Sequence, residues 1–85
     1  MARLSRVVVP GLPYHATHRG NRRGRIFFGE EDREGYLAHL ERYCSLHGLA
    51  VWAWCLMTNH VHLIVVPERE ESMGLALGNA HGKYA

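Results

Sequence analysis

Two histidines separated by a single residue are the most chemically informative feature of the sequence, within Asn59-His60-Val61-His62-Leu63. On an extended strand, residues i and i+2 point to the same face of the sheet. The two imidazoles would then stand side by side as neutral nitrogen donors, which suits a divalent metal ion. Taken alone, such a pair more often consists of two half-exposed or hydrogen-bonded structural histidines. The choice between a metal-binding pair and a structural pair therefore depends on the rest of the sequence.

Arginine dominates the first third of the chain. Residues 1–25 hold six arginines and no acidic residue, whereas all eight carboxylates come later, against four basic residues. Because the guanidinium group binds phosphate as a planar fork, this asymmetry predicts a polyanion, in particular nucleic acid, as partner. A solvated basic surface is the alternative. The candidate DNA-binding residues lie in or beside one basic loop: Arg19, Asn21, Arg22, Arg23 and Arg25.

Several aromatic side chains are candidates for stacking on single-stranded bases. They are Tyr14, Phe27, Phe28, Trp52 and Trp54, and the two tryptophans are expected on one side of their strand, over an open face or in the core. His15 and His18 are expected on opposite faces of another strand. One of them would neighbour the metal, although a structural role for both is the alternative.

Length and composition indicate one small globular domain spanning residues 1–85, with 47% hydrophobic residues. No apolar run approaches the ~20 residues that span a bilayer, and no signal peptide is recognisable. The two cysteines, Cys44 and Cys55, are expected to be reduced and buried. A cytoplasmic protein without membrane contact is therefore predicted.

The clearest expected helix covers residues 31–47, with an apolar stripe that includes Tyr36 and Cys44. Short strands are expected at Val7–Val9 and at residues 14–19, and the segment 26–28 is expected as a buried hydrophobic anchor. Residues 49–57 and 60–66 indicate a hairpin that turns at Thr58-Asn59, and Ser72 is expected to cap a last helix. The order β-α-β-β-α is typical of an α+β, ferredoxin-like fold with an antiparallel sheet, two helices on one face and the other face open.

The sequence resembles the HUH-type single-tyrosine transposases, especially the branch associated with repetitive extragenic palindromes. The similarity is carried by residues 7–15, 19–23 and 55–64, and it runs over essentially the whole chain. The segment with the two histidines is the most specific part. Thr58 departs from the family pattern, which usually has proline there, and this changes the rigidity of the corner more than its chemistry.

The resemblance implies a ferredoxin-like core in which His60 and His62 bind Mg²⁺ or Mn²⁺. It also implies single-stranded DNA, with hairpin structure, as the substrate. A tyrosine on a later helix would attack the phosphate, form a 5′-phosphotyrosine link and release a 3′-OH, and a second strand would then resolve the link by strand transfer. The same helix would supply a third metal ligand.

The nucleophile is the element of this resemblance that matches the sequence least closely. Tyr84 is the one tyrosine that follows the histidines and is the candidate within the sequence. The resemblance places the catalytic tyrosine after a further strand, so the chain is expected to be truncated at its C-terminus, without the final strand and the catalytic helix. An exposed sheet edge would favour a homodimer. The alternatives are a non-catalytic remnant that binds single-stranded nucleic acid, and an inactive remnant.

Overall fold

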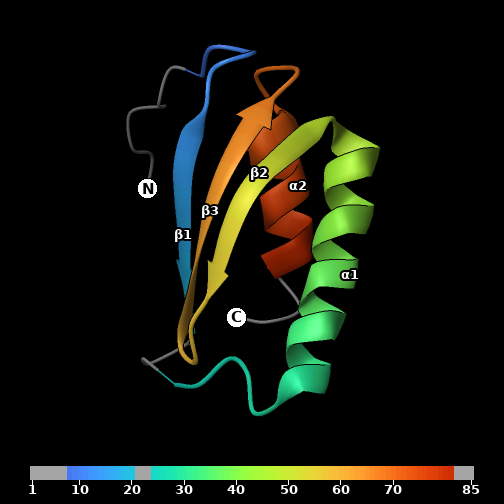
Figure 1. The fold of residues 1–85 in the computed structure, drawn as a ribbon. Helices are drawn as coiled ribbons and strands as arrows, with labels where there is room; N and C mark the ends of the chain where they lie inside the picture. Colours follow the sequence, from blue (N-terminus) through green and yellow to red (C-terminus); the bar gives the residue numbers. More distant parts are fainter. Residues whose placement is uncertain (1–7, 21–23, 82–85) are drawn as a thin grey trace, which may run out of the picture.

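The computed structural model describes residues 8–20 and 24–81 of the chain. Three strands form one antiparallel sheet in which the last strand along the chain lies between the other two, and both helices pack on the same side of the sheet (Figure 1). This arrangement confirms the expected α+β fold with ferredoxin-like β-α-β-β-α order. The elements along the chain are β1 (Tyr14–Arg19), α1 (Glu30–His47), β2 (Leu49–Leu56), β3 (His60–Pro67) and α2 (Ser72–His81).

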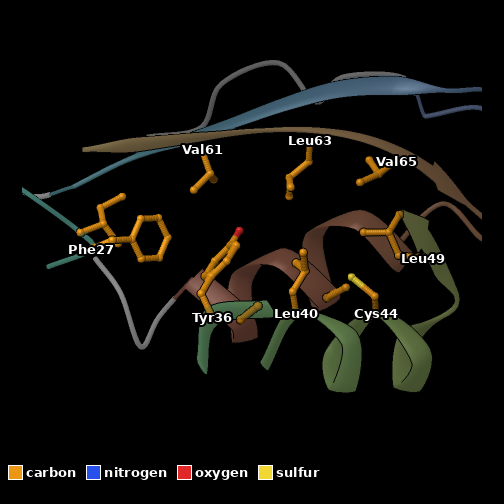
Figure 2. Close-up of a cluster of buried hydrophobic side chains, with 11 residues drawn as sticks. Phe27, Tyr36, Leu40, Cys44, Leu49, Val61, Leu63 and Val65 are labelled. Carbon is orange, nitrogen blue, oxygen red and sulfur yellow. The ribbon is translucent and has the colours of Figure 1, made fainter. Parts of the chain in front are cut away.

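The central strand β3 alternates strictly between half-buried and buried residues. Val61, Leu63 and Val65 point towards the helices and are at most 1% exposed. Figure 2 shows these three side chains above Tyr36 and Leu40 of α1, with the core between sheet and helix. Burial of each such side chain contributes about 1.5–3 kcal/mol, so the core fixes which face of β3 carries its polar residues.

Helix α1 follows the expected pattern closely. Acidic residues occupy its first turn, where they interact favourably with the helix dipole. The expected stripe is buried, with Tyr36, Leu40 and Cys44 as its innermost residues. Burial raises the pKa of the Cys44 thiol to about 11, which keeps it protonated. Gly48 ends the helix with a φ of 72°, a left-handed conformation that glycine adopts at low cost.

Helix α2 begins at Ser72, but Ser72 does not cap it in the expected way. Its hydroxyl instead accepts a hydrogen bond from the backbone N–H of Arg69, at 3.1 Å, and so closes the turn before the helix. Ala76 and Ala80 are fully buried, and small residues here let α2 approach α1 and the sheet. Within the described ranges, neither helix has the length and apolar character needed to cross a membrane.

Four further local expectations were wrong. Val8 and Val9 form no strand; the backbone N–H of Val9 donates to the Tyr14 hydroxyl, at 2.7 Å, and Val7 lies outside the described residues. Phe28 is 71% exposed, whereas its neighbours Ile26 and Phe27 are buried as expected. Cys55 is exposed and not buried.

The fourth concerns the two tryptophans of β2, which do not share a face. A register shift between Val51 and Ala53 places one extra residue, Trp52, in β2 at this point. After the shift, Trp54 pairs with Leu63, whose side chain faces the helices. A bulge of this kind changes the alternation of a strand. Trp52 and Trp54 are 65% and 54% exposed, so neither is a core residue.

A buried polar cluster joins both helices to the sheet. The Tyr36 hydroxyl and His81 Nε2 lie 2.7 Å apart, and the ring of His81 stacks on that of His18, with centroids 4.1 Å apart. Burial, and secondarily the positive charge of a protonated His18, lowers the pKa of His81 to about 4. His81 is therefore neutral in the folded protein at neutral pH.

This cluster predicts a stability change in mild acid. The unfolded chain protonates His81 near its ordinary pKa of 6.5, while the folded chain resists protonation down to about 4. The free energy of unfolding should therefore fall as the pH drops from 6.5 to 4, by as much as about 3 kcal/mol, and then level off for this group. Urea denaturation at a series of pH values measures this.

The matched variant is His81→Gln, whose amide still pairs with the Tyr36 hydroxyl but does not titrate. Carboxylates also titrate in this range, so the difference between the two proteins isolates His81. Parallel pH dependence in the wild type and His81→Gln would show that His81 is not held neutral by its surroundings.

Candidate metal centre

Strand β3 presents His60 and His62 on the face of the sheet that the helices leave open. Both residues are half-buried, and they alternate with the buried Val61 and Leu63. Their ring centroids lie 4.8 Å apart, with the ring planes at 78°. The two imidazoles are therefore neighbours on one accessible surface, in the positions that strand periodicity predicted.

His60 takes its orientation from the residue before it. His60 Nδ1 lies 2.7 Å from Oδ1 of Asn59. A carboxamide oxygen accepts hydrogen bonds and does not donate them, so Nδ1 carries the proton of the neutral ring. The other ring nitrogen, Nε2, is then the one with a free electron pair. This is the state in which a histidine coordinates a metal ion through Nε2.

His62 has a partner on the neighbouring strand. Its Nδ1 lies 3.0 Å from Nε2 of His15 on β1, and the two rings stack with planes 12° apart. His15 and His18 do lie on opposite faces of β1, and His15 is the one beside the candidate site. The pKa of His62 is lowered, first by burial and then by the positive charges of protonated His60, protonated His15 and Arg19. This favours the neutral form, which is the form that binds metal.

The donor set fits a partial metal site. In the part of the chain that the structure describes, no three His, Cys, Asp or Glu side chains are grouped so as to hold a metal ion together. Two imidazoles supply nitrogen ligands suited to Mn²⁺, while Mg²⁺ prefers oxygen. Water, a phosphate oxygen or a side chain outside the described ranges would complete the coordination.

The surroundings of the two histidines are basic. Arg19 is exposed and lies directly opposite His60 in the β1–β3 register. Cys55 of β2 is the cross-strand neighbour of His62. It was expected to be buried, but the hairpin turn, in which the backbone N–H of Met57 donates to the carbonyl of His60, places it on the same face as His62. None of the described strand positions on this face carries a carboxylate. The open face is therefore suited to an anion.

The corner that leads into His60 is held by the loop after β1. The carbonyl of Thr58 accepts hydrogen bonds from the backbone N–H groups of Ile26 and Phe27, at 2.7 and 3.3 Å, and that of Asn59 accepts from Gly20, at 3.0 Å. The buried side chains of Ile26 and Phe27 anchor this loop in the core. Gly20 and the segment Ile26–Phe27 are therefore hydrogen-bonded to the corner of the histidine hairpin.

The remaining predicted site residues are placed only in part. Arg25 is exposed, with its guanidinium carbon 5.0 Å from the centroid of the Phe28 ring. This contact holds Arg25 on the loop that packs against the hairpin corner. The other candidates lie outside the described residues: Asn21, Arg22, Arg23 and Tyr84.

The close packing at Gly20 gives a testable consequence for the corner. A Cβ atom there would overlap the carbonyl oxygen of Gly24 and lie 3.1 Å from Cγ1 of Ile26. Backbone atoms cannot yield as a flexible side chain does, so Gly20→Ala should lower the free energy of unfolding by about 1–3 kcal/mol. Chemical denaturation measures this change.

Gly29→Ala is the matched control, because a Cβ at Gly29 meets nothing within 4 Å and the backbone there is extended. Because Gly29 is the N-cap of α1, where alanine is less favourable than glycine, this control should lower stability by at most about 1 kcal/mol and by less than Gly20→Ala. Equal stability of the two variants would contradict the tight loop–corner contact.

Comparison with known proteins places the whole arrangement in one family. Residues 8–85 match the family model described as "Transposase IS200 like". Searches of the curated proteins and of the solved structures gave no match. The family match extends over the strands, the helices and the histidine pair, and it confirms the resemblance to transposases that the sequence indicated. The chain belongs to the IS200-like transposase family.

Proposed function

We propose that this transposase domain binds single-stranded DNA across the open face of its sheet and takes part in metal-dependent nicking and strand transfer. The observation that carries the proposal is the pair His60 and His62, side by side on an accessible surface whose strand positions carry no carboxylate, with ring centroids 4.8 Å apart. A purely structural role would not require two adjacent imidazoles on the face that the helices leave uncovered.

In this proposal, His60 and His62 hold Mn²⁺ or Mg²⁺ through their Nε2 atoms. When bound, such an ion polarises the scissile phosphate as a Lewis acid. Asn59 orients His60, and the hairpin corner keeps both rings in register with β1. Arg19, opposite His60, binds the phosphate backbone beside the site. Exposed Trp52 offers a surface on which a base can stack.

The attacking tyrosine lies elsewhere. Tyr36 is fully buried in the core, and Tyr14 pairs in the sheet with Val65, whose side chain faces the helices. Tyr43 belongs to α1, on the far side of the sheet from the histidines. The described tyrosines therefore do not reach the open face, and the proposal assigns to residues 8–81 the binding of metal and DNA. Tyr84 is the one tyrosine outside the described residues.

A second function is a binding domain without chemistry on the same fold. The surface beside Arg19, whose strand positions carry no carboxylate, supports single-stranded nucleic-acid binding whether or not a metal is held. The two functions differ in their response to metal. A domain that only binds would show the same DNA affinity with a divalent ion and with a chelator.

Metal binding by His60 and His62 can be tested by calorimetry. Isothermal titration with Mn²⁺ should give one binding event in the wild type, and His60→Ala or His62→Ala should abolish it, because each removes one of two nitrogen ligands. His39→Ala, which changes a histidine of α1, is the matched control and should bind as the wild type does. Absence of Mn²⁺ binding by the wild type would refute the metal-dependent function.

DNA binding by the open face of the sheet can be tested through its dependence on salt. Fluorescence anisotropy with a labelled, hairpin-flanked single strand should show an affinity that falls with salt. Arg19→Ala should weaken binding and reduce the slope of log K against log salt by about 0.7, the value for one phosphate contact to a single strand. Arg42→Ala, on α1, should leave the slope unchanged. An unchanged slope in Arg19→Ala would remove Arg19 from the interface.

Substitution of Tyr84 separates binding from a possible covalent step. Because metal and DNA binding are assigned to β1 and β3, Tyr84→Phe should leave both unchanged. A covalent DNA adduct detected with the wild type and lost in Tyr84→Phe would identify Tyr84 as the nucleophile. Weakened Mn²⁺ binding in this variant would instead show that Tyr84 itself contributes to the metal site.

A further inference from the structure

The contact between His15 and His62 links two strands across the candidate site. In the β1–β3 register Thr17 is directly opposite His62, and His15 is its diagonal neighbour on the same face. The approach of the two rings is specific in spite of this offset. His15 Nε2 lies 3.0 Å from His62 Nδ1, and the ring centroids are 5.2 Å apart with nearly parallel planes. The contact therefore fixes both the position and the rotation of the His62 ring.

A hydrogen bond between two neutral imidazoles requires one ring N–H and one free electron pair. If Nδ1 of His62 holds the proton, Nε2 of His62 has the free pair and His15 Nε2 is the acceptor. His60 is already in the corresponding state, because Asn59 Oδ1 accepts from its Nδ1. With this assignment, both histidines of β3 present Nε2 as the nitrogen that can coordinate an ion.

We propose that His15 is a positioning residue, whose Nε2 accepts the Nδ1–H of His62 and thereby fixes His62 in the tautomer with a free Nε2. Asn59 does the same for His60, so each histidine of the pair has its own oriented partner, one from the hairpin corner and one from β1. Partners of this kind typically change metal affinity by about 10- to 100-fold. The choice of His62 as the donor and the consequence for metal binding both rest on the proposed function, whereas the tautomer itself is measured without a metal.

Direct coordination by His15 is the competing role for this residue. It is disfavoured because its Nε2 is at hydrogen-bond distance from Nδ1 of His62, the ring nitrogen on the opposite side from Nε2. As a ligand, His15 would be as essential as His60. As a positioning residue, its loss weakens binding and leaves both ligands in place.

The tautomer is measured on the metal-free protein by long-range ¹H–¹⁵N NMR correlation of the imidazole nitrogens, under conditions where the histidines are neutral. The wild type should show His62 protonated at Nδ1. In His15→Phe, which keeps an aromatic ring but removes the acceptor, His62 should shift towards the Nε2–H tautomer that free imidazoles prefer. His62 protonated at Nε2 in the wild type, or an unchanged tautomer in His15→Phe, would overturn the proposal.

The affinity for Mn²⁺ supplies a second readout. His15→Phe should bind about 10- to 100-fold more weakly than the wild type, and His15→Gln, whose side-chain oxygen can accept the same hydrogen bond, should recover most of the loss. Thr17→Val is the matched control, because it changes the residue directly opposite His62 without touching this contact.

The two readouts separate failure of this proposal from failure of the proposed function. Equal Mn²⁺ affinity of His15→Phe and the wild type would overturn the positioning role alone. Complete loss of binding in His15→Phe and in His15→Gln, as in His60→Ala, would make His15 a ligand and overturn it too. A wild type that binds no Mn²⁺ refutes the metal site, while the NMR measurement still decides whether His15 sets the tautomer.

Discussion

The two-residue period of β3 is the constraint on which the fold and the candidate site both depend. One set of its residues, Val61, Leu63 and Val65, fills the core, and the alternate set includes His60 and His62. A slip of one residue in the pairing of β3 would expose the core residues and bury the histidines. The hydrophobic effect therefore secures the placement of two polar side chains that contribute nothing to it.

Strand pairing places the rings of His60 and His62 on one face of the sheet. Hydrogen bonds to these rings then determine which ring nitrogen of each is available to coordinate an ion. The Nδ1 atoms of His60 and His62 contact Asn59 and His15, at 2.7 and 3.0 Å. The carbonyls of Thr58 and Asn59, bound by the loop after β1, hold the corner from which His60 starts. The polar network of the open face and the apolar core of the other face thus meet at the β2–β3 corner, so a disturbance of the loop is expected to reach the histidines.

Much of this was predictable from the sequence, because it follows from local periodicity. The limits of β1, α1 and β3, the open sheet face and the shared face of His60 and His62 were expected within a residue or so. What failed depends on long-range geometry. The bulge that separates Trp52 from Trp54 has no local signal. That His15, and not His18, neighbours the histidine pair follows from the register of β1 against β3, which sequence alone does not fix.

The central claim is that Nε2 of His60 and Nε2 of His62 face one point on the open side of the sheet. A crystal structure of the protein grown with Mn²⁺, with data collected at a wavelength where manganese scatters anomalously, tests this directly. The expected result is an anomalous peak within bonding distance of both Nε2 atoms, with Asn59 and His15 still hydrogen-bonded to the Nδ1 atoms. A peak that contacts neither ring, or a metal bound through Nδ1 of His62 in place of its contact with His15, would contradict the claim.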